Sequence, residues 1–125
     1  MILMTGYFKL ARNVSKLSDH KVKVGAVIVN KKPVSACSNK AKTHPTYANP
    51  DKGRIGSLHA EIRCLINCER EDLTGAIIYV YREVKGGRPA LARPCSACLG
   101  YLKEAGVKKM IYTINEYPYY QTERL

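Results

Sequence analysis

The fold is decided by residues 22–38, which read VKVGAVIVNKKPVSACS. Residues 22–29 are rich in β-branched side chains, and this composition favours a strand. Residues 30–33, Asn-Lys-Lys-Pro, are typical of a turn. Residues 34–38 predict a second strand, so the sequence predicts an antiparallel hairpin at the start of the sheet.

Outward from this hairpin, hydrophobic periodicity predicts helices that alternate with further strands. The expected helices span residues 5–18, 58–69 and 95–105, and the expected strands span residues 75–82 and 107–114. Ser57 offers an N-cap to the second helix, and Gly106 ends the third. Residues 116–125 are ambiguous, since they fit either a short edge strand or a partly ordered end.

The order of these elements predicts an α/β fold. Strand–helix alternation after the hairpin favours parallel strands joined by right-handed crossovers. We therefore expect one domain over residues 1–125, a three-layer α/β/α sandwich whose mixed sheet combines the antiparallel hairpin with parallel strands. Two long loops, residues 39–57 and 85–94, are expected to border a site, because loops of this length in small domains are often functional.

Composition narrows the classes of partner. The formal net charge is +11, from 21 basic and 10 acidic residues spread along the chain. Such a balance favours a phosphorylated or polyanionic partner, without separating free nucleotides from nucleic acid, although some basic proteins are merely soluble. The five cysteines cannot all pair, and the N-terminus lacks the layout of a signal peptide. We expect reduced cysteines in the cytoplasm and no membrane partner.

Two half-motifs lie at the starts of neighbouring predicted helices. His59 and Glu61 open one helix, and Cys95 and Cys98 open the next. In open α/β sheets, sites form at the strand ends where such helices begin. One imidazole and two thiolates supply three zinc ligands and leave a fourth position open, as in catalytic zinc sites. Taken alone, Cys95 and Cys98 also fit a redox pair or half of a structural zinc site, and His59 and Glu61 also fit a satisfied core or surface pair.

The two half-motifs together resemble those of a known superfamily. His59-Ala60-Glu61 followed by Pro94-Cys95-Ser96-Ala97-Cys98 resembles the signature of the zinc-dependent cytidine and deoxycytidylate deaminases. The resemblance runs from about Lys23 to Ile114, and the compact chain is similar to small phage-type members.

This resemblance implies a site and a reaction. It implies that His59, Cys95 and Cys98 bind Zn²⁺ and that Glu61 is the proton shuttle. It also implies that Asn39 and Ala60 contact the substrate. The implied reaction is hydrolysis of a cytosine-containing nucleoside or nucleotide, of the cytidine, deoxycytidine or dCMP type, to the uracil product and ammonia.

The loop between Asn39 and His59 carries the remaining substrate candidates. His44 is expected to contact a phosphate and Tyr47 to stack on a base, although solvent exposure or loop packing would explain either residue. The loop's cations favour a phosphate-bearing substrate. One departure from many deoxycytidylate deaminases is the run Ile62-Arg63-Cys64, where they commonly carry an asparagine.

Several alternatives stay open at this stage. The nine tyrosines and the positive charge also fit a deaminase acting on single-stranded DNA or RNA. The same zinc constellation serves purine deaminases, and a zinc-stabilised binding domain without catalysis is a further alternative. A homo-oligomer also stays open, and Cys37, Cys64 and Cys68 are expected to be core residues.

Overall fold

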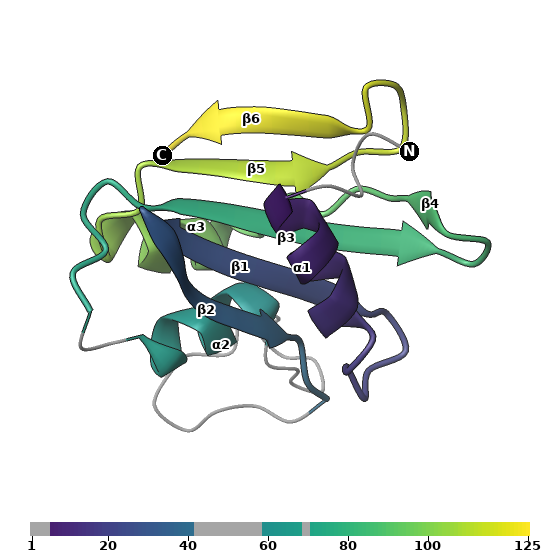
Figure 1. The fold of residues 1–125 in the computed structure, drawn as a ribbon, viewed down its shortest axis with the longest axis horizontal. Helices are drawn as coiled ribbons and strands as arrows, with labels where there is room; N and C mark the ends of the chain where they lie inside the picture. Colours follow the sequence, from purple (N-terminus) through teal and green to yellow (C-terminus); the bar gives the residue numbers. More distant parts are fainter. Residues whose placement is uncertain (1–5, 42–58, 69–70) are drawn as a thin grey trace.

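The computed structural model describes residues 6–41, 59–68 and 71–125, and every structural statement below concerns these residues (Figure 1). Within them the chain forms three helices and six strands. The helices are α1 (Gly6–Ser15), α2 (Ala60–Asn67) and α3 (Ser96–Glu104). The strands are β1 (Val24–Asn30), β2 (Lys32–Ser38), β3 (Ile77–Val84), β4 (Arg88–Pro89), β5 (Lys109–Thr113) and β6 (Tyr120–Arg124).

The sheet is mixed, in the order β2-β1-β3-β5-β6, with the short β4 paired to β3. The predicted hairpin is confirmed, because β1 and β2 pair in the antiparallel sense. Parallel pairing occurs between β3 and β5, whereas β3 lies antiparallel to β1. Since β1 is antiparallel to both of its neighbours, β2 and β3 run in the same direction. The carboxyl ends of β2, β3 and β5 therefore lie at one edge of the sheet.

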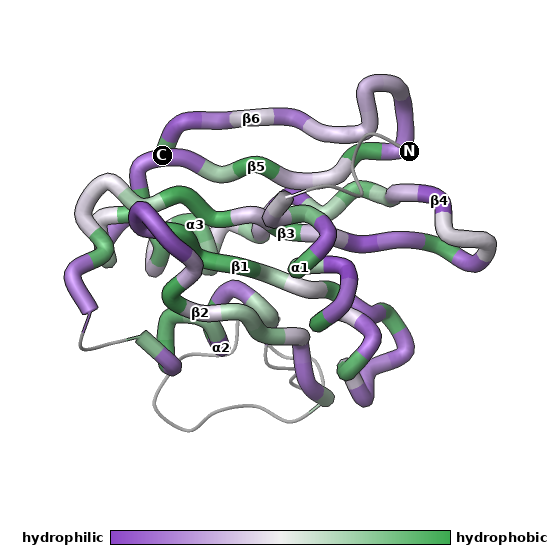
Figure 2. Tube along the Cα trace, in the orientation of Figure 1, coloured by the Kyte–Doolittle hydropathy of each residue, from purple (hydrophilic) through white to green (hydrophobic). Residues whose placement is uncertain are grey.

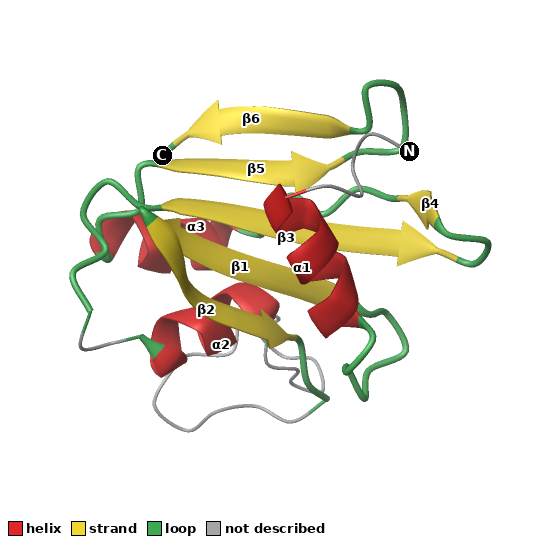
Figure 3. Ribbon diagram, viewed as in Figure 1, coloured by secondary structure: helices red, strands yellow, loops and turns green. Residues whose placement is uncertain are grey.

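Helices cover both faces of this sheet, which confirms the predicted three layers. Helix α1 lies on one face, and α2 and α3 lie on the other (Figures 1 and 3). The interior strand β1 is buried on both sides: Val27 packs in the cluster under α1, and Ile28 packs in the larger cluster under α2 and α3. A strand buried on both faces needs a nearly continuous apolar run, and Figure 2 shows this hydrophobic stretch along β1.

Several boundaries differ from the sequence prediction. Helix α2 begins at Ala60 with His59 as its N-cap, so the expected cap at Ser57 was wrong, and Ser57 itself lies outside the described residues. The ambiguous tail forms the edge strand β6. Strand β4 was missed because it depends on a tight turn, in which Gly86 and Gly87 both have positive φ.

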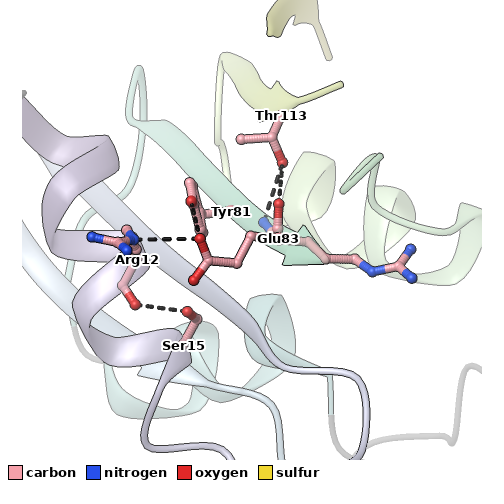
Figure 4. A network of polar contacts seen from close by, with 6 residues as sticks. Arg12, Ser15, Tyr81, Glu83 and Thr113 are labelled. Atoms are coloured by element: carbon pink, nitrogen blue, oxygen red, sulfur yellow. Dashed lines mark hydrogen bonds and ion pairs between the residues drawn. The ribbon is translucent and has the colours of Figure 1, made fainter. Parts of the chain in front are cut away.

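A polar network fastens α1 to β3 (Figure 4). The Arg12 Nε lies 3.4 Å from Glu83 Oε2, and the Tyr81 hydroxyl donates a hydrogen bond of 2.8 Å to the same oxygen. Burial, together with Glu83, raises the pKa of Tyr81, so its hydroxyl keeps its proton at neutral pH. On the neighbouring strand, Thr113 Oγ1 donates to the Ala90 carbonyl at 2.7 Å. The Glu83 carboxylate therefore already has two partners within the fold, Arg12 and Tyr81.

The three cysteines expected in the core are buried there. Cys37, Cys64 and Cys68 are all less than 7% exposed. Cys64 Sγ donates to the Ala26 carbonyl at 3.2 Å, which joins α2 to β1. As for membranes, none of the described helices has the length and apolar character needed to span one.

Gly25 in β1 sets how closely α1 can approach the sheet. A Cβ at this position would lie 1.9 Å from the Ala11 carbonyl oxygen and 2.9 Å from the Ser15 backbone nitrogen. Both atoms are helix backbone, so the whole helix must shift. We expect Gly25→Ala to lower the free energy of unfolding by about 2–3 kcal/mol, the usual cost of overpacking a core. Urea denaturation measures this difference.

Gly100 provides the matched control for that measurement. It lies in α3, and nothing lies within 4 Å of the position its Cβ would take. Gly100→Ala should raise the free energy of unfolding by roughly 0.5–1 kcal/mol, because alanine restricts the unfolded chain and suits a helix. Equal effects of the two substitutions would contradict the proposed close approach of α1.

Candidate active site

The starts of α2 and α3 form the candidate site. Both helices pack on the same face of the sheet and against each other. His59 is the N-cap of α2, and Cys95 is the N-cap of α3. Pro94, directly before Cys95, is fully buried. The two half-motifs, distant in sequence, therefore meet at the helix N-termini.

Three potential metal ligands converge at this point. His59 Nδ1 lies 3.3 Å from Cys98 Sγ and 3.7 Å from Cys95 Sγ. The ligand atoms of the three residues all lie within 4.8 Å of one another. Cys98 is fully buried, whereas His59 and Cys95 are partly exposed. The group is therefore closed on the protein side and accessible on the other.

The electrostatics of the group suit a metal cation. Hydrogen bonding, first to Cys98 and then to His59, lowers the pKa of Cys95 to about 4, although burial acts in the opposite direction. The Cys98 backbone N–H also donates to Cys95 Sγ at 3.5 Å. A cysteine with this pKa is a thiolate at neutral pH, and the thiolate is the form that binds metal. One histidine and two cysteines fit zinc, and the set leaves room for a fourth ligand.

Glu61 is buried in the first turn of α2, two residues after His59. Glu61 is only 5% exposed, and this burial raises the pKa of its carboxyl group. The charge of His59 lowers the pKa of Glu61, whereas the charge of Cys95 raises it further. A carboxyl group whose pKa is moved toward neutrality by burial can both accept and return a proton.

Asn39 follows β2 and has structural partners that the sequence did not reveal. Its Oδ1 accepts hydrogen bonds from the Val24 backbone N–H at 2.9 Å and from the Ser18 hydroxyl at 2.6 Å. Its Nδ2 donates to the Val22 carbonyl at 2.7 Å. The amide thus ties the connection between α1 and β1 to the end of β2. A second Nδ2 hydrogen takes no part in these three bonds, and the substrate contact expected of Asn39 stays a prediction.

Arg63 is the site residue that sequence reasoning missed. Its Nη1 donates to the Ser38 carbonyl at 2.7 Å and to the Ser38 hydroxyl at 3.3 Å. Arg63 lies one helical turn after His59, and the backbone hydrogen bond between them measures 3.1 Å. It therefore links the helix that carries a metal ligand to the strand end that carries Asn39. The available signal was a charged residue four positions after the histidine, on the same side of the helix.

The Arg63→Met substitution tests this link. Methionine keeps an unbranched stem and removes the donors to Ser38, so we expect the free energy of unfolding to fall by roughly 1.5–3 kcal/mol, as for hydrogen bonds to charged groups. Chemical denaturation of the zinc-loaded protein measures the change. Arg124→Met is the control; Arg124 is the last residue of β6, and its substitution should change stability little. Equal effects would mean that the bonds to Ser38 contribute nothing specific.

The remaining predicted substrate residues are placed only in part. Ala60 is fully buried between His59 and Glu61, and its expected substrate contact stays a prediction. His44 and Tyr47 lie outside the described residues, so their expected roles stay predictions as well.

Fold and site together define a class of protein. An α/β/α sandwich carries His59, Cys95 and Cys98 at two helix N-termini, positioned to bind zinc, with a buried glutamate beside them. The chain belongs to the family described as the cytidine and deoxycytidylate deaminase zinc-binding region, whose sequence profile matches residues 3–114. The resemblance seen in the sequence is thereby confirmed.

Among individual proteins, the chain is similar to phage deaminases. It is 37% identical over 59 residues to the deoxycytidylate deaminase of Mycobacterium phage D29, a match covering 47% of this chain and 38% of that relative. The apo structure of dCMP deaminase from the cyanophage S-TIM5 superposes with a TM-score of 0.61 at 25% identity, covering 85% of this chain and 78% of the other.

A second structure of the same cyanophage enzyme supports the fold. The S-TIM5 dCMP deaminase in complex with dCMP and dUMP superposes with a TM-score of 0.62 at 24% identity. The superposition covers 86% of this chain and 78% of the other.

Proposed function

We propose that this protein is a hydrolytic deaminase that converts a cytosine nucleotide to the uracil nucleotide, with dCMP as the first candidate substrate. The observation that carries the proposal is the cluster of His59, Cys95 and Cys98 with Glu61 buried beside it. Membership of the deaminase family supports this chemistry. The complex of the cyanophage relative with dCMP and dUMP supports the choice of nucleotide.

In the proposed reaction, the protein binds the base and moves protons. His59, Cys95 and Cys98 would hold a zinc ion, which would act as a Lewis acid and make a water molecule nucleophilic at neutral pH. Glu61 accepts a proton as that water adds to C4 of the ring and delivers a proton to the ring nitrogen N3. Glu61 then takes the second proton of the added water and transfers it to the amino group; the C4–N bond breaks, the oxygen stays on C4 as the carbonyl, and ammonia leaves. The raised pKa of Glu61 suits both directions of this transfer.

Substrate binding is assigned to the residues around this cluster. Asn39, held at the end of β2 by its bonds to the preceding connection, is proposed to contact the sugar or the base with its remaining amide hydrogen. Ala60 is proposed to contact the base through its backbone, next to Glu61. His44 and Tyr47 are proposed to contact the phosphate and the base. The net charge of +11 is consistent with a phosphorylated substrate.

Ammonia release by the zinc-loaded protein tests the proposal. The substrates are dCMP, deoxycytidine, CMP, dCTP, adenosine and guanine, each at equal concentration. We expect dCMP to give the highest kcat/KM and deoxycytidine to be at least about tenfold poorer, because a charged hydrogen bond to phosphate contributes about 1.5–3 kcal/mol. Release from a purine alone, or no release from any cytosine compound at one zinc per chain, would contradict the proposal.

A further inference from the structure

A basic groove lies at the carboxyl end of β3, and none of its lining residues belongs to the metal-ligand group or is needed for the proposed reaction. Its walls come from the connection between α1 and β1 and from the end of β3, and its volume is about 310 Å³. The basic residues that line it are Lys16, Lys21, Lys23, Arg82 and Lys85. We call it the lysine groove.

The lysine groove keeps a positive charge even though Glu83 also lines it. The Glu83 carboxylate is engaged by Arg12 and by the Tyr81 hydroxyl, as Figure 4 shows. Lys16, Lys21 and Lys85 are all exposed to solvent. An anion in this groove therefore meets several cations whose charge the neighbouring carboxylate does not cancel.

A second groove continues the first along the edge of the sheet. Its volume is about 420 Å³, and it shares Arg82 and Val84 with the lysine groove. Arg88, Leu91 and Asn115 also line it. Together the two grooves run from the connection after α1 to the residues that follow β5.

Apolar side chains are interspersed with the cations of this surface. Val22, Val84 and Leu91 line the grooves and are 41%, 40% and 56% exposed. One phosphate group would engage only part of so long a basic surface. A single-stranded nucleic acid repeats a phosphate at every nucleotide and presents apolar base faces between them, so it matches both features.

Both grooves lie at the edge of the sheet where α2 and α3 begin. Val22, in the wall of the lysine groove, accepts a hydrogen bond from Asn39, and the adjacent Ser38 is held by Arg63 of α2. The groove wall is thus joined through a short chain of contacts to α2, the helix whose N-cap is His59. Figure 1 shows the ends of β2 and β3 and the connection after α1 at this same edge.

We propose that this chain binds single-stranded nucleic acid along the two grooves, with its phosphates on the lysines and arginines named above. Deamination of a single nucleotide needs no such surface, so this inference goes beyond the proposed function.

The test is fluorescence anisotropy of the zinc-loaded 125-residue chain with a labelled oligothymidylate. An oligonucleotide of about 15 nucleotides covers the range of single-strand binding sites, and thymine offers no amino group to the active site. The variants are Lys21→Gln/Lys85→Gln in the groove and Lys103→Gln/Lys108→Gln as the control. Both control lysines are exposed and lie at the opposite end of the sheet, by the end of α3 and the start of β5. The two variants have the same net charge.

We expect the groove variant to bind about 25-fold more weakly at about 0.1 M salt, since each lost phosphate contact removes about 0.7 from the slope of log K against log salt. The control variant should bind like the wild-type protein, apart from a small general effect of charge. Circular dichroism and zinc content check that both variants are folded.

Three results would overturn the inference. One is an absence of binding at low salt, and another is an equal loss of affinity in both variants. The third is competition by thymidine triphosphate as effective, per phosphate, as competition by unlabelled oligonucleotide, because the grooves would then hold a free nucleotide. Since the binding assay involves no deamination, a failure of the proposed reaction leaves the assay intact, and a failure of binding leaves the ammonia measurements intact.

Discussion

Glu61→Gln is expected to lower kcat for the best cytosine substrate by about 10²–10⁴-fold, the usual contribution of a positioned general acid and base. Glutamine has nearly the same shape as glutamate but cannot accept and return a proton. Because Glu61 is buried and burial raises its pKa, the neutral amide should be tolerated without loss of stability. Ammonia release measures the effect, and zinc analysis should still show one ion per chain.

Glu104→Gln is the matched control for that measurement. Glu104 is the last residue of α3, is exposed, and lies at the opposite end of that helix from Cys95. It should leave kcat and zinc content unchanged. If Glu61→Gln kept wild-type activity, the proton transfer assigned to Glu61 would be wrong, and the reading of the chain as a zinc-stabilised binding domain would gain support.

Cys98→Ala is expected to remove both zinc and activity and to lower the melting temperature. Cys98 is the fully buried member of the ligand group, and its loss leaves two ligands for the ion. Ligand binding stabilises a folded protein in proportion to the logarithm of its affinity, so loss of a tight metal site removes several kcal/mol. Thermal melts with and without a chelator measure this: the chelator should lower the wild-type melting temperature strongly and that of Cys98→Ala very little.

Cys68→Ala separates loss of zinc from loss of a core side chain. Cys68 is 2% exposed, its Sγ donates to the Cys64 carbonyl at 2.9 Å, and it lies at the far end of α2 from His59. The variant should lose a little stability through the small cavity, about 1 kcal/mol, while it keeps its zinc and its response to the chelator. A Cys98→Ala protein that still held one zinc per chain would show that the ligand set is different from the one proposed.

Local sequence predicted much of this structure because the relevant interactions are local. The hairpin of β1 and β2 depends on a short turn and two β-rich runs, and both were visible in residues 22–38. The ligands at 59, 95 and 98 were visible because the chemistry of zinc restricts residue types and spacing. Burial of Cys37 could likewise be expected from its place in a strand.

Pairings between distant segments could not be predicted in the same way. Strand β3 pairs with β1 in the antiparallel sense. This pairing depends on which edge of the hairpin is free once the hairpin has formed, and no local sequence pattern encodes that choice. The edge strand β6 was ambiguous because its residues are mostly exposed and lack a buried apolar face. The Arg63 bonds to Ser38 join residues that are 25 positions apart and were therefore invisible to periodicity.

By itself, the sequence determined the hairpin, the alternation of helices and strands, and the residue types of a zinc site. Each of these follows from backbone propensity, hydrophobic period or ligand chemistry, which act over a few neighbouring residues. Only the tertiary structure decided that the histidine and the two cysteines meet, that Asn39 and Arg63 hold the strand end beside them, and that the lysines after α1 join Arg82 in a groove. The physical reason is that the order of the strands brings the carboxyl ends of β2, β3 and β5 to one edge, and strand order is set by the packing of the whole sheet.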